Sequence, residues 1–204
     1  VNKVGGGKAD EVIPCIGCHE GCLEEMTQGR PTSCAVRPTT GHEIEWPLGP
    51  VSGAPKLLVV GGGPAGIEAA RAGAERGFAV TLWEAGERLG GNLGPAATPE
   101  FKLDIDRYVT YLRGLPARLP IDVELNKRAT KQSVIDFSAD CIVIATGAVM
   151  EAPPVARNDS VAVLTAIDLL TGAVTARGDR IVVMGGGFIG CETAVHLARH
   201  GAQV

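Results

Sequence analysis

The sequence has no basic cluster, no long apolar run and no initiating methionine. The 204 residues carry a formal net charge of -4, and binding to a nucleic acid backbone needs concentrated Lys and Arg. This excludes nucleic acid as a partner and favours a small molecule. No stretch reaches the roughly 18 uninterrupted apolar residues of a membrane helix, and residues 1–10 lack the pattern of an export signal. We therefore expect no membrane partner and a cytoplasmic location.

The two ends of the sequence have the character of internal segments. The chain begins with Val1 and stops at Ala202-Gln203-Val204, where the pattern predicts the start of a new apolar strand. We therefore expect a fragment at both ends. The sequence is compatible with a homo-oligomer but carries no signal for one.

Disulfide bonds are not favoured by the placement of the six cysteines. Four of them crowd into residues 15–34, whereas Cys141 and Cys191 stand alone in apolar surroundings. Paired cysteines of a secreted framework are normally spread along the chain. We expect a reducing compartment, with Cys141 and Cys191 as small buried hydrophobic residues.

The clustered cysteines follow the pattern Cys15-x2-Cys18-x3-Cys22-x11-Cys34. Three closely spaced thiolates and a distant fourth can ligate the four irons of a [4Fe–4S] cluster. Zinc sites more often use two separated Cys-x-x-Cys pairs, so structural zinc is the weaker alternative and incidental thiols are the third. With four cysteines available, we expect His19 beside the cluster or at the surface rather than as a ligand. Five prolines among the first 50 residues indicate a loop-rich segment that needs such a staple.

A strand, a glycine turn, a helix and a second strand follow within about 30 residues. The expected strands are 56–60 and 79–84, and the expected helix is 67–77. The turn reads Gly61-Gly62-Gly63-Pro64-Ala65-Gly66, which is the dinucleotide-binding pattern in its proper context. Gly61 permits the tight turn, Gly63 lets a pyrophosphate approach and Gly66 lets the helix pack closely. Glu84 then stands where a carboxylate would accept the ribose hydroxyls. The plainer alternative is a glycine-rich turn with a surface glutamate.

The remaining pattern predicts an α/β protein with a second unit of the same kind. We expect a helix over 101–115, strands over 121–125 and 140–145, and then a strand at 181–184, a turn at 185–190 and a helix at 191–200. Two such Rossmann-like units suggest two nucleotide sites. The predicted parts are an iron–sulfur segment at 1–50, a first nucleotide-binding domain at 51–150 and the start of a second at 151–204.

Taken together, these motifs resemble the carboxyl-terminal half of the NADH:flavin oxidoreductase family, which includes 2-enoate reductase, 2,4-dienoyl-CoA reductase and trimethylamine dehydrogenase. The resemblance rests on the cysteine segment with Gly41-His42-Glu43, the two glycine turns, Leu89-Gly90-Gly91-Asn92-Leu93 and Ala145-Thr146-Gly147. It implies glutathione reductase-like FAD- and NAD(P)-binding domains. It also implies an amino-terminal (β/α)8 barrel that holds FMN and the substrate. This chain does not contain that barrel.

The resemblance also implies the role of each site residue. The cluster ligands would be Cys15, Cys18, Cys22 and Cys34. The residues lining FAD would be Gly61, Gly63, Pro64, Ala65, Gly66, Glu84, Ala85, Gly90, Gly91, Asn92, Ala145, Thr146 and Gly147. The residues approaching the pyrophosphate of NAD(P)H would be Gly185, Gly187 and Gly190.

The function implied by the resemblance is electron transfer from NAD(P)H through FAD and the cluster to FMN, for reduction of an enoate or dienoyl-CoA. No side chain of this chain is predicted as a catalytic acid or base, because the cofactors carry the chemistry. We expect His42, His196 and His200 to be structural or surface residues. The alternatives are an amine dehydrogenase with ADP in the first site, and a zinc-stapled nucleotide-binding module without catalysis.

Overall fold

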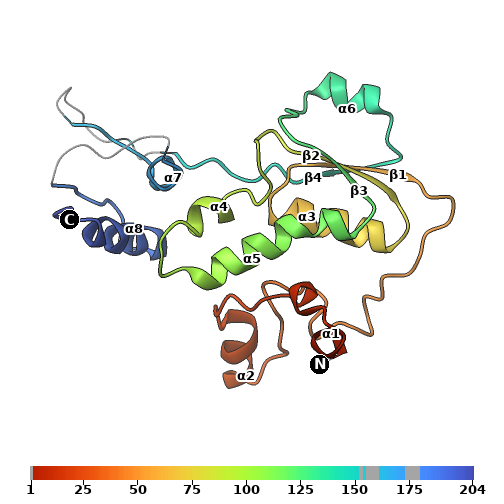
Figure 1. Ribbon diagram of the computed structural model, residues 1–204, viewed down its shortest axis with the longest axis horizontal. Helices are drawn as coiled ribbons and strands as arrows, with labels where there is room; N and C mark the ends of the chain where they lie inside the picture. The colour runs from red at the N-terminus through yellow and green to blue at the C-terminus, as the bar shows by residue number, and fades with distance from the viewer. Residues whose placement is uncertain (1, 152–153, 155–160, 173–179) are drawn as a thin grey trace. The chain divides into compact units, whose positions relative to one another are not determined.

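The computed structural model describes residues 2–151, 154, 161–172 and 180–204. These residues fall into two compact units (Figure 1). The first unit combines Val1–Gly91 with Arg107–Gly147, and the second combines Asn92–Asp106 with Ala148–Val204. The cysteine segment therefore groups with the first nucleotide-binding unit. The three-part division at 50 and 150 stays a prediction.

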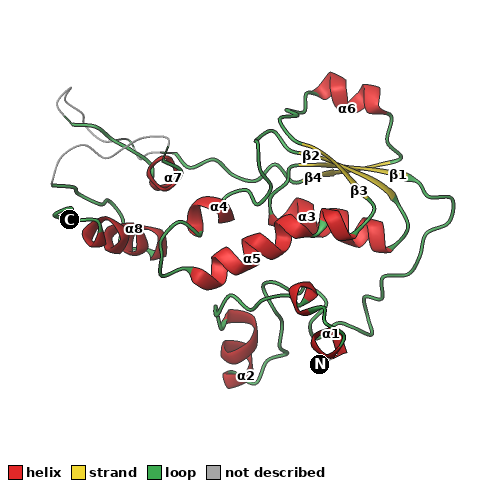
Figure 2. Cartoon of the chain, in the orientation of Figure 1, coloured by secondary structure: helices red, strands yellow, loops and turns green. Residues whose placement is uncertain are grey.

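The first unit is built on a four-stranded parallel sheet (Figure 2). Its strands are β1 (Lys56–Val60), β2 (Ala79–Trp83), β3 (Ile121–Glu124) and β4 (Cys141–Ile144), in the order β3-β2-β1-β4. All four lie within one residue of the predicted ranges. The pattern worked here because a parallel strand covered on both faces is a short continuous run of apolar residues.

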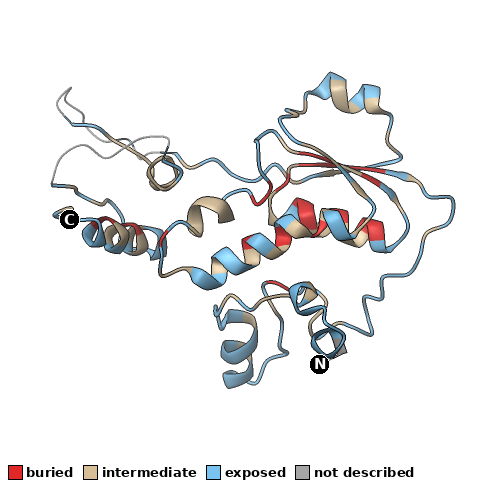
Figure 3. Cartoon of the chain, viewed as in Figure 1, coloured by how far each residue is buried: buried red, intermediate tan, exposed pale blue. Residues whose placement is uncertain are grey.

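Helices lie on both faces of this sheet (Figure 1). Helix α3 (Pro64–Glu75) and helix α5 (Leu103–Gly114) lie on one face, and α6 (Lys131–Phe137) lies on the other. Helix α3 can approach closely because Gly73 has no side chain, and a Cβ there would overlap the Leu57 side chain. The resulting core is concentrated in β1, β2 and α3 (Figure 3).

The opposite face of the sheet has its own core cluster. Leu58, Val60 and Trp83 are buried there, and Val134 and Phe137 pack against them. The rings of Trp83 and Phe137 meet edge to face with centroids 5.2 Å apart. Helix α6 was not predicted. Thr130 and Ser133 form a capping box at its start, but Ser133 stands where the sequence signature of such a box has Glu or Gln.

The amino-terminal segment consists of short helical turns and loops, as its prolines predict. They are α1 (Asn2–Gly5), η1 (Ala9–Glu11), η2 (Glu20–Glu24) and α2 (Glu25–Thr27). Hydrogen bonds tie this segment to the rest of its unit. The guanidinium of Arg118, at the end of η3 (Pro116–Arg118), donates to the carbonyl of Asp10 at 2.9 Å, and the guanidinium of Arg76 donates to the carbonyl of Gly49 at 3.0 Å.

The second unit contains helices α4 (Leu93–Ala96), α7 (Ala166–Leu170) and α8 (Phe188–Arg199). Helix α8 confirms the helix expected at 191–200, three residues earlier at its start. The expected strand at 181–184 is wrong, because the described residues there form only one bridge, between Arg180 and Gln203. Val182 is 90% exposed, and a strand needs a paired neighbour on which to form. No described helix is long and apolar enough to cross a membrane.

Candidate functional site

The first glycine turn joins the end of β1 to α3 and is sterically locked. Gly61 has a φ of +109°, and a Cβ there would overlap the carbonyl oxygen of Ala145 and lie 2.7 Å from its carbonyl carbon. A Cβ on Gly66 would overlap the carbonyl oxygen of Gly61. Only glycine fits at these two positions, because backbone cannot move aside as a flexible side chain can.

Gly63 is different, because the protein itself leaves room beside it. It caps α3 with a φ of -75° and a ψ of -179°, a conformation that any residue can adopt. The nearest atom to a Cβ at Gly63 would be the Cα of Gly91, 3.9 Å away. No side chain caps the helix at this position, so the first amide groups of α3 face the open space. This cradle fits an anionic pyrophosphate.

Glu84 is held at the same turn by two backbone amides. Gly62 donates to one carboxylate oxygen at 2.7 Å, and Gly86 donates to the other at 2.6 Å. Ala85, between Glu84 and Gly86, is exposed. The carboxylate thus lies beside the glycine turn at the carboxyl end of β2, the edge of an open α/β sheet at which ligands bind.

Two further predicted segments close around this turn. Gly90 donates to the carbonyl of Gly62 at 2.8 Å, and a Cβ on Gly91 would lie 3.0 Å from the Cα of Gly63. Ala145 donates to the carbonyl of Val60 at 2.8 Å, and Thr146 and Gly147 follow it. Sequence reasoning missed Arg113, which donates to the carbonyl of Leu89 at 2.8 Å and supports the loop from α5. No sequence signal marks that contact.

Asn92 is the predicted flavin-site residue that the structure does not group with the others. It belongs to the second unit, where its side chain donates to the carbonyl of Ala148 at 3.2 Å. The remaining predicted residues of the first site lie in one compact unit.

The second glycine turn repeats the backbone of the first. Gly185 has a φ of +112°, Gly187 caps α8 with a φ of -77° and a ψ of 178°, and a Cβ on Gly190 would overlap the carbonyl oxygen of Gly185. Beside this turn lies a groove of about 330 Å³ lined by residues 181–183, Gly190, Ala194 and others. The same cradle for an anionic group is therefore present twice.

The cysteine segment folds back on itself. Ser33 donates to the carbonyl of Gly21 at 2.6 Å, which brings the chain before Cys34 alongside the chain before Cys22. A Cβ on Gly21 would lie 2.5 Å from the Ser33 hydroxyl oxygen, so glycine is needed for this approach. The amide of Gly17 donates to the sulfur of Cys15 at 3.3 Å, a contact of the kind that tunes cluster potentials.

The four thiols of this segment are the candidate metal ligands. Cys15, Cys18 and Cys22 are exposed and Cys34 is half-buried. Within the described part of the chain, no three cysteine sulfurs lie within 4.8 Å of one another. Soft thiolates suit either an iron–sulfur cluster or zinc.

The expectation that Cys141 and Cys191 are buried is wrong, because both are exposed. Cys141 begins β4, the strand at one edge of the sheet, and Cys191 lines the groove beside the second glycine turn. An apolar sequence neighbourhood predicts burial only where another element covers it.

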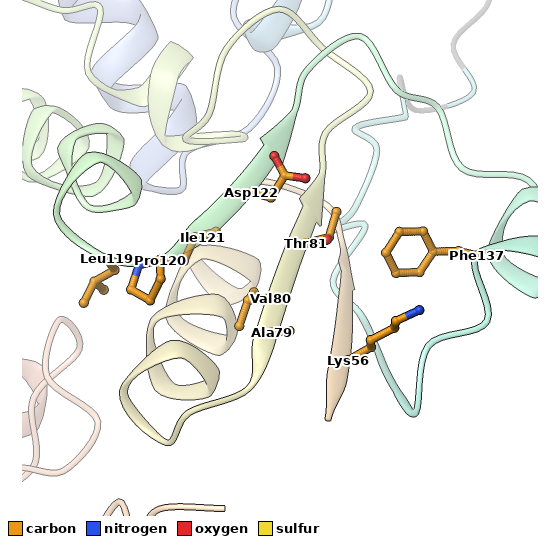
Figure 4. Close-up of a pocket in the computed structure, with 9 residues that line it drawn as sticks. All are labelled: Lys56, Ala79, Val80, Thr81, Leu119, Pro120, Ile121, Asp122 and Phe137. Carbon is orange, nitrogen blue, oxygen red and sulfur yellow. The ribbon is translucent and has the colours of Figure 1, made fainter. Parts of the chain in front are cut away.

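A larger cavity of about 590 Å³ lies at the other end of the sheet (Figure 4). Its lining includes Lys56, Ala79 and Ile121, the first residues of β1, β2 and β3, together with Phe137. It is therefore at the amino ends of the strands, opposite the glycine turn. Nucleotides bind at the carboxyl ends of such strands, so this cavity is not the nucleotide site.

The sequence of this chain matches a described family over most of its length. The model of the pyridine nucleotide-disulphide oxidoreductase family matches residues 55–204. The chain belongs to this family. Membership makes it part of an oxidoreductase with a flavin- and nicotinamide-nucleotide-binding fold.

Individual relatives confirm the resemblance drawn from the motifs. A cinnamate reductase from Clostridium sporogenes is 38% identical over 203 residues, which cover 100% of this chain and 30% of the relative. The structure of a 2-naphthoyl-CoA reductase matches with a TM-score of 0.92 at 32% identity, over 98% of this chain and 31% of that one. A histamine dehydrogenase from Rhizobium sp. 4-9 matches with a TM-score of 0.86 at 27% identity, over 98% and 32%. The chain thus spans about a third of the length of these relatives.

Proposed function

We propose that this chain is the NAD(P)H-oxidising, electron-transferring part of an iron–sulfur flavoprotein that reduces a C=C bond of an enoate or dienoyl-CoA. Electrons would pass from NAD(P)H to FAD and then, one at a time, through a [4Fe–4S] cluster to FMN. The FMN and the small-molecule substrate would occupy a barrel outside this chain. The observation that carries the proposal is the presence of two like glycine cradles and a folded cysteine segment in one chain.

The chain's own residues would bind and orient the cofactors. FAD would lie along the first turn, with its pyrophosphate at the start of α3 beside Gly63 and its ribose near Glu84. The nicotinamide nucleotide would use the equivalent start of α8 beside Gly187. FAD supplies the step between a two-electron hydride donor and one-electron carriers.

The cysteine segment supports the cluster in two ways. It supplies four thiolates, one for each iron of a [4Fe–4S] cluster, and the match to the cinnamate reductase covers the whole chain, including the cysteines that lie before residue 55. Cys15, Cys18, Cys22 and Cys34 would each ligate one iron.

The amine dehydrogenase alternative is less favoured, on two observations. The cinnamate reductase matches at 38% identity over the whole chain, whereas a dimethylamine dehydrogenase from Hyphomicrobium matches at 33% over 72% of it. The second cradle also keeps Gly185, whose φ of +112° favours glycine, and Gly190, where a Cβ would overlap the carbonyl oxygen of Gly185. A working nicotinamide site is needed by a reductase and not by an enzyme that holds only ADP in its first site.

The proposal is tested on the full-length natural protein, purified without oxygen. We expect about four iron and four acid-labile sulfide per chain, together with FAD and FMN released on denaturation. We also expect the flavin absorption to bleach on addition of NADH or NADPH. Release of ADP in place of FAD would favour the amine dehydrogenase proposal over the reductase proposal. One zinc and no sulfide would refute the cluster.

A further inference from the structure

Two histidines and a glutamate converge at the end of α8 that is remote from its glycine cradle. His196 and His200 are four residues apart and so share one face of the helix, with ring centroids 4.3 Å apart. Glu100, in the turn before α5 and in the same compact unit, faces them. One ligand atom from each of the three side chains lies within 4.8 Å of the other two.

The hydrogen bonds of the two imidazoles leave lone pairs free for a further partner. Nδ1 of His200 is 2.8 Å from the carbonyl oxygen of His196. A carbonyl can only accept, so Nδ1 carries the hydrogen and Nε2 keeps its lone pair. Nδ1 of His196 is buried and has no hydrogen-bond partner, although it lies 3.7 Å from a carboxylate oxygen of Glu100. Buried polar atoms without partners are rare and call for an explanation.

The carboxylate of Glu100 is already held in position. One oxygen of Glu100 accepts from the Arg199 guanidinium at 3.1 Å, and the other is the oxygen that faces His196. Arg199 also lies over the ring of Phe101, the next residue after Glu100. The free oxygen is therefore presented to the imidazoles by a fixed segment.

We propose that Glu100, His196 and His200 bind a divalent transition metal of the zinc class, at a site distinct from the cysteine segment. Two imidazoles and one carboxylate are a three-ligand set that zinc completes with water, and imidazole disfavours magnesium and calcium. Residue 197 is leucine, so the helix lacks the glutamate of the His-Glu-x-x-His motif. The ion would therefore fasten the Glu100 turn to α8 rather than catalyse hydrolysis.

The test is a Co²⁺ titration of the full-length natural protein after treatment with a chelator. Co²⁺ bound by nitrogen and oxygen shows only ligand-field bands in the visible spectrum, whereas Co²⁺ bound by cysteine adds strong near-ultraviolet charge-transfer bands. We expect one ion whose ligand-field bands stand alone in the difference spectrum against the cobalt-free protein, and which Zn²⁺ displaces. The variants His200→Gln and Glu100→Gln are both at exposed positions. Each should lower the affinity for Co²⁺ by more than the roughly 10- to 100-fold that follows when a ligand loses its hydrogen-bond partner.

Glu192→Gln is the matched control, because it breaks the neighbouring ion pair with Lys102 on the same two segments without removing a ligand. It should bind Co²⁺ as the unsubstituted protein does. Unchanged Co²⁺ affinity in both His200→Gln and Glu100→Gln would overturn the site. A titration that gives only thiolate charge-transfer bands would also overturn it.

Discussion

Gly66 and Gly61 touch through their backbones across the first glycine turn: the space for a Cβ on Gly66 is filled by the carbonyl oxygen of Gly61, and the Gly61 carbonyl carbon would be 3.0 Å away. The protein leaves an ordinary van der Waals distance beside Gly63, in contrast. Gly66 and Gly63 therefore have separable roles within one motif. Gly66 is needed for steric fit within the protein, and Gly63 leaves access for a ligand.

The first prediction uses this pair. Gly66→Ala should destabilise the unit by more than about 2 kcal/mol, because backbone must move to admit the methyl group. Gly63→Ala should leave the thermal midpoint of the FAD-free protein unchanged but weaken FAD binding at least about tenfold, since the methyl group occupies the pyrophosphate position. Differential scanning calorimetry and flavin titration measure the two effects. Equal loss of stability in both variants would contradict the assignment of Gly63 to the ligand.

The second prediction transfers the comparison to the second cradle. Gly187→Ala should keep bound FAD but slow its reduction by NADH and NADPH at least about tenfold, because only the nicotinamide nucleotide uses that position. Gly63→Ala is the control with the reverse pattern, in which FAD is lost first. Anaerobic stopped-flow reduction and FAD content separate the two. Normal reduction kinetics in Gly187→Ala would show that the start of α8 does not bind the nicotinamide nucleotide.

The sheet and the steric need for glycine in the first turn could be predicted from sequence because each depends on local pattern. Strand β1 is one apolar run, and Gly61 and Gly66 are required by contacts within a six-residue turn and its neighbouring strand. The expected strand at 181–184 and the expected burial of Cys141 and Cys191 failed for the opposite reason. The pairing of a strand and the burial of a side chain depend on which other element lies alongside. The sequence of a single segment does not show which element that is. The support of Leu89 by Arg113, 24 residues further on, was likewise beyond any local pattern.

The third prediction concerns Glu84, which accepts from the amides of Gly62 and Gly86. Glu84→Gln replaces one accepting oxygen with an NH2 group that faces a backbone donor. Hydrogen bonds to a charged group contribute about 1.5–3 kcal/mol, so FAD affinity should fall roughly 10- to 100-fold as the turn and the ribose contact are lost together. Glu87→Gln, an exposed neighbour, is the control. Equal FAD affinity in Glu84→Gln and Glu87→Gln would remove Glu84 from the site.

The fourth prediction concerns the return of the cysteine segment. Gly21→Ala places a methyl group 2.5 Å from the hydroxyl oxygen and 2.8 Å from the carbonyl oxygen of Ser33. This contact should push the loop that carries Cys34 away from Cys22. Iron and acid-labile sulfide per chain should fall by at least about half, while FAD content is kept. Gly49→Ala lies in the same segment with no atom within 4 Å of the added Cβ and should keep a full cluster. A full cluster in Gly21→Ala would show that Cys34 is placed by other contacts.

The fifth prediction is a pH dependence at the opposite face of the sheet. The indole N–H of Trp83, itself 3% exposed, donates to a carboxylate oxygen of Glu124 at 2.8 Å, and this bond lowers the pKa of the Glu124 carboxyl, with Lys127 adding to the effect. A group whose pKa is lower in the folded state stabilises that state above its unfolded pKa of about 4.3. That contribution should disappear as the pH falls from about 4.3 through the folded value.

The Trp83 bond can be followed because the residue that donates it is also fluorescent. Glu124→Gln keeps an oxygen that accepts from the indole but has no proton to gain, so its stability should not show this component of acid loss. Trp83→Phe, which removes the donor, should raise the pKa of Glu124 towards its ordinary value. Urea unfolding between pH 3 and pH 6, followed by tryptophan fluorescence (Trp46 and Trp83) in the first two proteins and by circular dichroism in all three, measures the difference. The same fall in stability in Glu124→Gln as in the unsubstituted protein would place the acid sensitivity elsewhere.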